Sequence, residues 1–241
     1  MDLGIAGKVA LVTASSKGLG RAAAEALAAD GARLVICGRD RDNLAAAEAA
    51  VRDTGAEVLA VAADVTDPAA PGELVRAALE RFGALDILVG NAGGPPPARA
   101  LDLTDEQIAA AINGNLTTSV RLVREALPPM RAAGWGRICL ITSYTVKQPV
   151  PDLALSNLAR TGLWAWAKTA AQDVFASGVT LNLACPGVHA TDRMRQLGGR
   201  SGPMGDPADF GKVVAFLCSQ AASFITGSAV LVDGGAVAGL L

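Results

Sequence analysis

A glycine-rich turn near the start of the chain carries the clearest chemical signal. It runs from Thr13 to Gly20, directly after the apolar residues 9–12 and directly before an alanine-rich segment that begins at Arg21. Because Gly18 and Gly20 have no Cβ, the backbone can turn sharply and a ligand can approach it, while free amides at a helix start favour an anionic phosphate. The pattern predicts a dinucleotide site, although an ordinary strand-to-helix connection explains a single glycine-rich turn equally well. The turn residues assigned to the ligand are Thr13, Ser15, Ser16, Lys17, Gly18, Leu19 and Gly20.

Two cations indicate which dinucleotide is bound. A free ribose 2′-hydroxyl is usually held by an acidic residue after the second strand, whereas a 2′-phosphate requires a cation there. Here the second apolar run ends in Cys37-Gly38-Arg39, and Lys17 lies within the turn itself. Arg39 offers a planar, permanently charged fork for a phosphate. NADP(H) is therefore the predicted cofactor, the alternative being that both side chains are solvated surface charges.

These residues need a scaffold, and the hydrophobic pattern supplies one. Short apolar runs alternate with longer alanine-rich segments of helical period, which is typical of a parallel sheet with helices on both faces. The strands are predicted at 8–13, 33–37, 57–62, 85–90, 137–142, 179–184 and 229–232. Right-handed crossovers then give a doubly wound α/β sheet that binds ligands at the carboxyl ends of its strands. No linker divides the 241 residues, so we expect residues 1–241 to form a single domain.

Local signals also place helix ends and one helix face. Asp67-Pro68 and Asp206-Pro207 each offer an N-cap followed by proline at the first helical position, and Thr104 with Gln107 matches a capping box. Helices are expected to stop at Gly31, Gly55, Gly83 and Gly178. One buried stripe of a long helix is predicted from Ile108, Ile112, Leu116, Val120, Val123 and Leu127.

Composition argues against several classes of function. The 21 Lys and Arg residues nearly balance 23 Asp and Glu and form no basic stripe, so nucleic acid is not an expected partner. No apolar run is long enough to cross a bilayer and the first residues do not resemble a signal peptide, so we expect a cytoplasmic protein without a membrane partner. The four cysteines are far apart in sequence, which favours reduced core thiols over a disulfide or a metal site.

Several spaced motifs make the whole chain resemble the short-chain dehydrogenase/reductase family. The turn Thr13–Gly20 is similar to the family's Thr-Gly-x-x-x-Gly-x-Gly, Asn91-Ala92-Gly93 to its Asn-Ala-Gly, and Pro186–Thr191 to its Pro-Gly-x-x-x-Thr. The ending 225–235 also resembles that of the family. The resemblance implies a single-domain Rossmann fold with a seven-stranded parallel sheet. Ala14 replaces the family's first glycine, which is tolerable where φ is negative.

The resemblance also implies roles for individual residues. In the family a hydride passes between nicotinamide and a carbonyl or alcohol carbon. The cofactor contacts carried over are Asp64 and Val65 at the adenine, Asn91, Ala92, Gly93, Pro186 and Gly187, and Thr191 at the nicotinamide carboxamide. Asn115 matches the asparagine that supports a water, and Ser143 the serine that polarises the substrate oxygen. The alternatives are a polar residue on a helix face for Asn115 and a strand-end cap for Ser143.

The family's proton-transferring Tyr-x-x-x-Lys is replaced here by Ser156-Asn157-Leu158-Ala159-Arg160. Ser156 and Arg160 lie four residues apart, so they share one helix face. A serine hydroxyl is a far weaker acid than a tyrosine, and Arg does not release a proton, so general acid catalysis worth roughly a hundred- to ten-thousand-fold is weakened. Arg160 can still bind the ribose and stabilise a developing alkoxide. The proton donor is left open between Ser156, a water, Tyr144, which should face away unless the chain turns after Ser143, and the loop residue Lys147.

Two functions remain in view. The first is an NADP(H)-dependent oxidoreductase acting on a small carbonyl or alcohol through Asn115, Ser143, Ser156 and Arg160. The second is an NADP(H)-binding module with weak or lost redox chemistry, in which occupancy by the cofactor serves regulation or assembly.

The segment between the cofactor motifs and the last helix leaves the substrate and the assembly open. This short, glycine-rich segment carries Arg193, Arg195 and Arg200, which suit either an anionic substrate or an exposed loop. The resemblance implies a homodimer or homotetramer, with Leu163, Trp164 and Trp166 either at its interface or buried in their own subunit.

Overall fold

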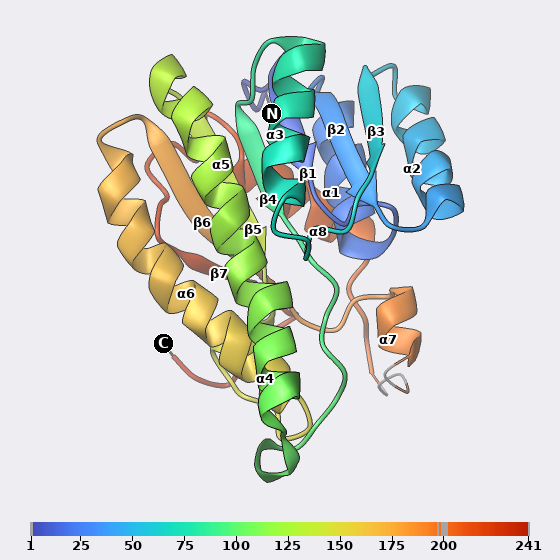
Figure 1. Ribbon diagram of the computed structural model, residues 1–241, viewed down its shortest axis with the longest axis vertical. Coiled ribbons are helices and arrows are strands. Elements are labelled where there is room, and N and C mark those ends of the chain that lie inside the picture. The colour runs from blue at the N-terminus through green and yellow to red at the C-terminus, as the bar shows by residue number, and fades with distance from the viewer. Residues whose placement is uncertain (1, 197, 199–201, 241) are drawn as a thin grey trace.

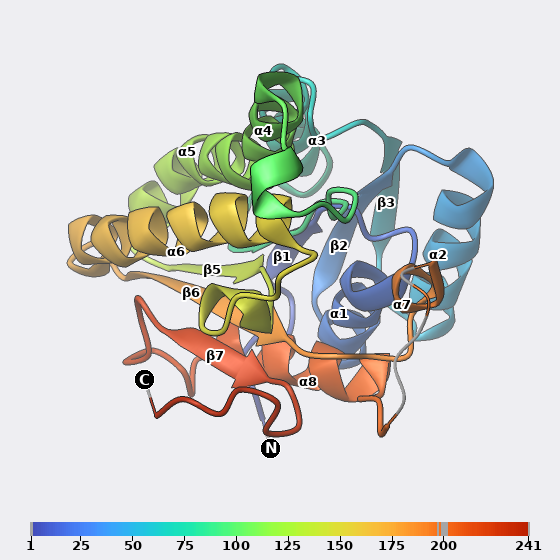
Figure 2. The ribbon, with the colours of Figure 1, turned by 90° about the horizontal axis from the view of Figure 1, so that it is seen from below.

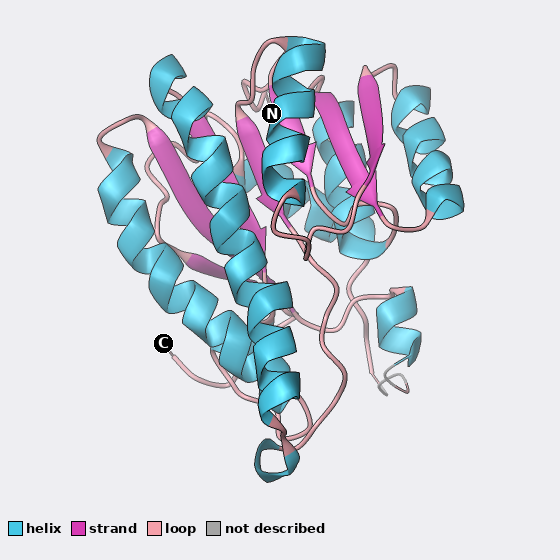
Figure 3. Cartoon of the chain, in the orientation of Figure 1, coloured by secondary structure: helices cyan, strands magenta, loops and turns pink. Residues whose placement is uncertain are grey.

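In a computed structural model, which describes residues 2–196, 198 and 202–240, the chain forms one twisted parallel sheet between two layers of helices (Figures 1 and 3). The strands are β1 (Val9–Val12), β2 (Arg33–Gly38), β3 (Val58–Ala62), β4 (Ile87–Gly90), β5 (Gly136–Ile141), β6 (Val179–Pro186) and β7 (Ala229–Val232). The helices are α1 (Gly18–Ala29), α2 (Arg41–Asp53), α3 (Ala70–Phe82), α4 (Asp105–Ile112), α5 (Thr118–Ala133), α6 (Ala154–Phe175), α7 (Asp192–Gln196) and α8 (Pro207–Leu217). Short 3₁₀ turns lie at Ala100–Asp102 and Tyr144–Val146, and a π-helical turn lies at Asn113–Thr117.

The strand order confirms the doubly wound fold. It reads β3-β2-β1-β4-β5-β6-β7, with every neighbouring pair parallel. All seven predicted strands are present, with ends displaced by at most two residues. The order reverses between β1 and β4, which is where a doubly wound sheet opens a crevice for its ligand.

Alternate residues of the strands point to opposite faces of the sheet and pack into two separate hydrophobic cores. Val9 and Leu11 of β1 pack with α3, α5 and α6 on one face, whereas Ala10 and Val12 pack with α1, α2 and α8 on the other. Figure 2, seen from below the view of Figure 1, separates these two layers. Both faces are covered, which explains why the central strands are almost continuously apolar.

The long helix predicted around residues 108–127 is present as α4, a π-helical turn and α5, but a different set of residues faces the core. The π-helical turn Asn113–Thr117 joins α4 to α5 and adds a residue to one turn, so a stripe spaced by fours and threes cannot stay on one face. Of the six predicted stripe residues only Val123 is fully buried, and the other five are half-buried. Besides Val123, the fully buried residues of α5 include Leu122, Ala126 and Met130.

The helix ends follow the sequence signals with one exception. Thr104 and Gln107 form the capping box, and Asp206 caps α8 with Pro207 as its first residue. The prediction for Asp67 was wrong: its carboxylate accepts the N–H of Ala69 at 2.9 Å within a turn, and α3 begins only at Ala70. Gly31, Gly55, Gly83 and Gly178 all have positive φ and follow helices as expected.

Apolar side chains of α6 mostly serve the subunit's own core. Leu163 is fully buried, and Trp164 and Trp166 are half-buried against the same cluster, so the structure favours the intramolecular alternative for these three residues. Across the part of the chain that the structure describes, no helix combines the length and apolar character needed to cross a bilayer.

Candidate active site

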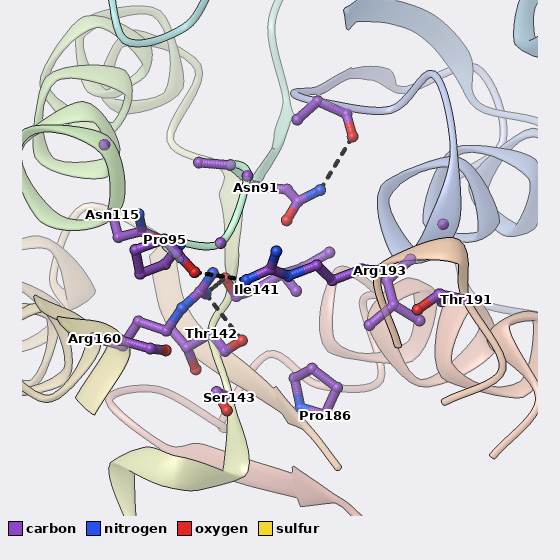
Figure 4. A pocket seen from close by; sticks show the side chains of 18 of the residues that line it. Asn91, Pro95, Asn115, Ile141, Thr142, Ser143, Arg160, Pro186, Thr191 and Arg193 are labelled. Carbon is purple, nitrogen blue, oxygen red and sulfur yellow. Dashed lines mark hydrogen bonds between the residues drawn. The ribbon is translucent and has the colours of Figure 1, made fainter. Parts of the chain in front are cut away.

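The carboxyl ends of β1, β2, β4, β5 and β6 surround one cleft of about 1010 Å³. The first turns of α1 and α6, the π-helical turn and α7 complete its walls. Most of the predicted site residues line it, and Figure 4 shows part of this set from close by. The lining members are Ser16, Lys17, Gly18, Leu19, Arg39, Asp64, Val65, Asn91, Ala92, Gly93, Asn115, Ser143, Ser156, Arg160, Pro186, Gly187 and Thr191.

The glycine-rich turn presents its amides to this cleft. Lys17 is the extended N-cap residue of α1 and makes no side-chain cap, so the first N–H groups of the helix have no side chain to satisfy them. Gly18 has φ +61°, and a Cβ on Gly20 would lie 2.5 Å from the Ala14 carbonyl oxygen. Uncapped amides, a left-handed glycine and a neighbouring lysine together fit a pyrophosphate.

Thr13, Ser15 and Gly20 lie behind the lining and brace the turn. The Thr13 hydroxyl donates to the Asn91 carbonyl at 2.7 Å and accepts the Asn91 N–H at 2.8 Å, which ties the end of β1 to the end of β4. The Ser15 hydroxyl donates to the Val12 carbonyl at 2.7 Å and accepts the Cys37 N–H at 3.1 Å. These side chains shape the site from within the core.

Ala14 does not have the negative φ that would make it a neutral replacement for glycine. Its φ is +45°, the only positive value outside glycine among the described residues. The conformation is fixed by its neighbours, because the Asn91 Nδ2 donates to the Ala14 carbonyl at 3.1 Å and the Ser15 N–H donates to the Cys37 carbonyl at 2.8 Å. The turn is therefore retained at the cost of backbone strain at Ala14.

The cofactor end of the cleft carries the predicted cations. Arg39, whose side chain is 75% exposed, forms an ion pair with Asp64 at 3.5 Å. The pKa of Asp64 lies below its ordinary value, chiefly because the Thr66 N–H donates to it, with the Thr66 hydroxyl and Arg39 adding to the effect. Lys17 lines the same cleft, so both predicted cations face it.

Arg160 is a buried anchor at the other end. Its Nη1 donates to the carbonyl oxygens of Ile141 at 3.0 Å and Thr142 at 2.9 Å, which fixes α6 against the end of β5. Burial lowers the pKa of the guanidinium to about 10, and the nearby cation of Arg193 adds to that effect. The group therefore stays cationic at neutral pH.

Ser143 and Ser156 reach the cleft from different elements. Ser143 follows β5 and its hydroxyl accepts the Thr145 N–H at 3.2 Å, which leaves its own proton for another acceptor. Ser156 lies in the first turn of α6, one turn before Arg160, and its hydroxyl makes no hydrogen bond to another described residue. Both hydroxyls are thus available as donors toward a ligand.

Asn115 is held by the π-helical turn with its side chain directed toward the cleft (Figure 4). Its Oδ1 is buried and has no hydrogen-bond partner among the described residues. A buried amide oxygen without a partner is costly, so a water or a ligand is needed to satisfy it. This agrees with the water-supporting role that the resemblance implies for Asn115.

The chain turns directly after Ser143, so the condition for Tyr144 to reach the site is met. The 3₁₀ turn Tyr144–Val146 begins there, and Tyr144 lines the cleft although it is 92% buried. Lys147 does not line the cleft as the structure describes it. Its Nζ lies 4.4 Å from the centre of the Trp164 ring, in a cation–π contact rather than in open solvent.

The loop after β4 and helix α7 contribute residues that the sequence motifs did not assign. Gly94 and Pro95–Pro97 line the cleft directly after Asn91–Gly93. The run of three prolines, whose φ angles are fixed, is the sequence feature that could have indicated a rigid wall here. Arg193 of α7 reaches across the cleft, and its Nη2 donates to the Pro95 carbonyl at 2.6 Å (Figure 4). Arg195 instead pairs with Asp192 on the exposed side of α7. Arg200 lies outside the described residues.

Comparisons with known proteins agree with this geometry. A family model described as enoyl-(acyl carrier protein) reductase matches residues 13–237. The human protein dehydrogenase/reductase SDR family member 4 is 32% identical over 244 residues, covering 96% of this chain and 88% of that protein. The Escherichia coli 3-oxoacyl-[acyl-carrier-protein] reductase FabG is 33% identical over 239 residues, covering 95% and 97% of the two chains.

Solved structures give the same result. L-sorbose reductase from Gluconobacter frateurii, determined with NADPH and L-sorbose, superposes with a TM-score of 0.93 at 32% identity, and the match covers 100% of both chains. A putative gluconate dehydrogenase from Agrobacterium tumefaciens superposes with a TM-score of 0.92 at 32% identity, also over 100% of both chains. With the dinucleotide turn, the sheet order and these full-length similarities in agreement, the chain belongs to the short-chain dehydrogenase/reductase family of oxidoreductases.

Proposed function

We propose that the protein is an NADP(H)-dependent oxidoreductase that transfers a hydride between nicotinamide and a small carbonyl or alcohol through an atypical proton relay. The observation that supports this proposal best is that Asn115, Ser143, Ser156 and Arg160 line the same cleft as the dinucleotide turn. Two of the four, Ser156 and Arg160, differ from the family's residue types. NADPH, when bound, supplies the hydride. NADP(H) is preferred over NAD(H) on the strength of Arg39 and Lys17, and a relative solved with NADPH supports that choice.

Each side chain has a definite task in this proposal. The Ser143 hydroxyl donates to the substrate oxygen, because it accepts the Thr145 N–H and its own hydrogen is not donated to any described residue. Arg160 places a fixed positive charge near the alkoxide that forms during reduction, in a buried site where that charge is weakly screened. Ser156, or a water beside it, passes the proton.

The test is NADPH consumption over a panel of aldehydes, ketones, diketones and quinones. The native protein is compared with Ser143→Ala and with the double variant Ser156→Tyr, Arg160→Lys. Native turnover that falls roughly 100- to 1,000-fold in Ser143→Ala supports the proposal, since that is the effect of removing one donor to a developing oxyanion. The double variant should be faster than the native protein, because it regains a tyrosine acid.

A binding module is the second candidate, and one observation favours it. Nη1 of Arg160 is committed to two backbone carbonyls, a structural task that explains the residue without catalysis. Under this alternative the native protein binds NADPH without turnover on any substrate of the panel, while the double variant reduces a carbonyl. Failure of the native protein to bind NADPH would overturn both candidates.

Assembly and location are further proposals that rest on the family. We expect a homodimer or homotetramer, which light scattering coupled to size-exclusion chromatography would measure directly. A cytoplasmic location remains a prediction from the sequence, to be tested by fractionation of cells that express the full protein.

A further inference from the structure

Four basic and four acidic residues are found in the described lining of the cleft, and two of the basic residues, Arg160 and Arg193, form no ion pair with any of the acidic ones. The acidic residues among its described lining are all occupied elsewhere: Asp40 caps α2, Asp64 pairs with Arg39, Asp152 lies 4.0 Å from Arg99, and Asp192 pairs with Arg195. None of these carboxylates forms an ion pair with Arg160 or Arg193. Two guanidinium groups therefore line one cavity without an ion pair to a carboxylate of the described residues.

Arg193 is the more available of the two. Its one hydrogen bond among the described residues runs from Nη2 to the Pro95 carbonyl, a neutral acceptor that leaves its charge unpaired. The guanidinium lies over Gly94, where a Cβ would stand 3.3 Å from Nη2 and 3.4 Å from Nε. The absence of a side chain at Gly94 makes room for the arginine inside the cleft, and the contact to Pro95 fixes one side of its fork.

Arg193 also crosses the cleft between Asn91, which is assigned to the cofactor, and Ser143, which is assigned to the substrate oxygen (Figure 4). It extends from α7 to the loop after β4, and in Figure 4 its side chain lies between Asn91 on one side and Thr142 and Ser143 on the other. Lys17 and Arg39 line the end with the glycine-rich turn and are the cations assigned to the dinucleotide. Arg160 is anchored to β5, so Arg193 is the cation left to meet a second anion.

We propose that Arg193 binds a carboxylate of the substrate, so that the enzyme acts on small carbonyl compounds or alcohols that also carry a carboxylate group. A guanidinium presents parallel N–H groups that match the two oxygens of a carboxylate, and it retains its charge on burial. Binding would replace or share the Pro95 contact and would satisfy the unpaired charge. The inference rests on the proposed oxidoreductase function and adds the class of substrate.

The experiment uses 4-formylbenzoate and 4-formylbenzamide, which have nearly the same shape and differ in charge. NADPH-dependent reduction of each is measured for the native protein, Arg193→Ala, Arg193→Lys and Arg195→Ala. Arg195 is the matched control, because it lies on the same helix, is paired with Asp192 and does not itself line the cleft. A charge-assisted pair is worth roughly a ten- to hundred-fold change, so Arg193→Ala should lose that factor in kcat/KM for the carboxylate and little for the amide. Arg193→Lys should recover part of the loss, and Arg195→Ala should behave as native.

A second measurement separates this inference from the proposed function. Binding of benzoate and benzamide to the NADPH complex is followed by calorimetry, and NADPH binding itself is measured for every variant. Benzoate binding that depends on Arg193 without any turnover would retain the carboxylate site and reject the oxidoreductase. Turnover of both aldehydes that is unchanged in Arg193→Ala would reject the carboxylate site and retain the enzyme. The inference is also overturned if Arg193→Ala weakens NADPH binding and both aldehydes lose activity equally, since Arg193 would then hold the cofactor.

Discussion

The two ends of the cleft depart from the family pattern in different ways. At the dinucleotide end the one departure, Ala14 for glycine, leaves the backbone path intact and places strain in a single φ angle. At the other end the resemblance matches Ser156 and Arg160 of α6 to the family's Tyr and Lys, and serine is a far weaker acid than tyrosine. A binding surface built from backbone amides tolerates a change of side chain better than a proton relay built from side chains.

The largest effect is expected from Arg160→Ala. The substitution leaves the buried carbonyls of Ile141 and Thr142 without their donor and should lower the free energy of unfolding by about 2–4 kcal/mol. Arg160→Lys, with its single nitrogen, should cost about 1 kcal/mol. Thermal and urea denaturation would measure both, with exposed Arg195→Ala expected within about 0.5 kcal/mol of native. A native-like Arg160→Ala would mean that the residue is not an anchor.

Next in size is the charge at the cofactor end. The double variant Lys17→Ala, Arg39→Ala should weaken NADPH binding by roughly 10- to 100-fold, because two contacts to the 2′-phosphate are lost. NADH binding should change by a few-fold at most. Fluorescence titration of both cofactors checks this, and equal losses for the two would show that these residues do not read the 2′-phosphate.

A smaller gain is expected from Ala14→Gly. Glycine relieves the cost of φ +45° but adds chain entropy to the unfolded state, so the free energy of unfolding should rise by about 0.5–1 kcal/mol. Chemical denaturation is the measurement. The affinity for NADPH should stay within a factor of two, since the backbone path is already that of the glycine turn. A lower free energy of unfolding for Ala14→Gly would mean that Ala14 is not strained at this φ angle.

The smallest effect is an absence of pH dependence. Arg160 keeps its proton up to about pH 9, because its lowered pKa is still about 10, and serine does not titrate in this range. The kcat/KM for reduction should therefore be flat from about pH 6 to 9. The Ser156→Tyr, Arg160→Lys variant should instead lose activity within the range as its tyrosine, acidified by the lysine, loses its proton. An inflection near neutrality in the native profile would point to another acid.

Much of the scaffold was predictable because it depends on local pattern. The alternating apolar runs located every strand, and the spacing of Ser156 and Arg160 placed both on one helix face toward the cleft. Parallel strands and short connections leave few ways to arrange such elements. The dinucleotide turn was equally accessible, because its glycines act through backbone geometry.

Features that depend on contacts between distant parts of the chain could not be predicted from the sequence. The φ of Ala14 is set by Asn91 and Cys37, which lie 77 and 23 residues away by sequence number. The π-helical turn displaced the expected stripe, and no local signal marked the two carbonyl partners of Arg160. The reach of Arg193 to Pro95 joins segments separated by 98 residues. Residues in loops find their roles only when the sheet has brought those loops together.

The contact between Lys147 and Trp164 has an optical consequence. The Lys147 ammonium lies 4.4 Å from the centre of the Trp164 ring, and Trp164 belongs to the helix that carries Ser156 and Arg160. The emission of an indole is sensitive to a positive charge held over its ring, so the intensity and colour of Trp164 emission report the position of the segment after Ser143. The protein thus carries an intrinsic probe beside its catalytic helix. Once Trp135 and Trp166 are replaced, so that Trp164 is the one tryptophan left, its emission can follow that segment as a ligand enters, without any label.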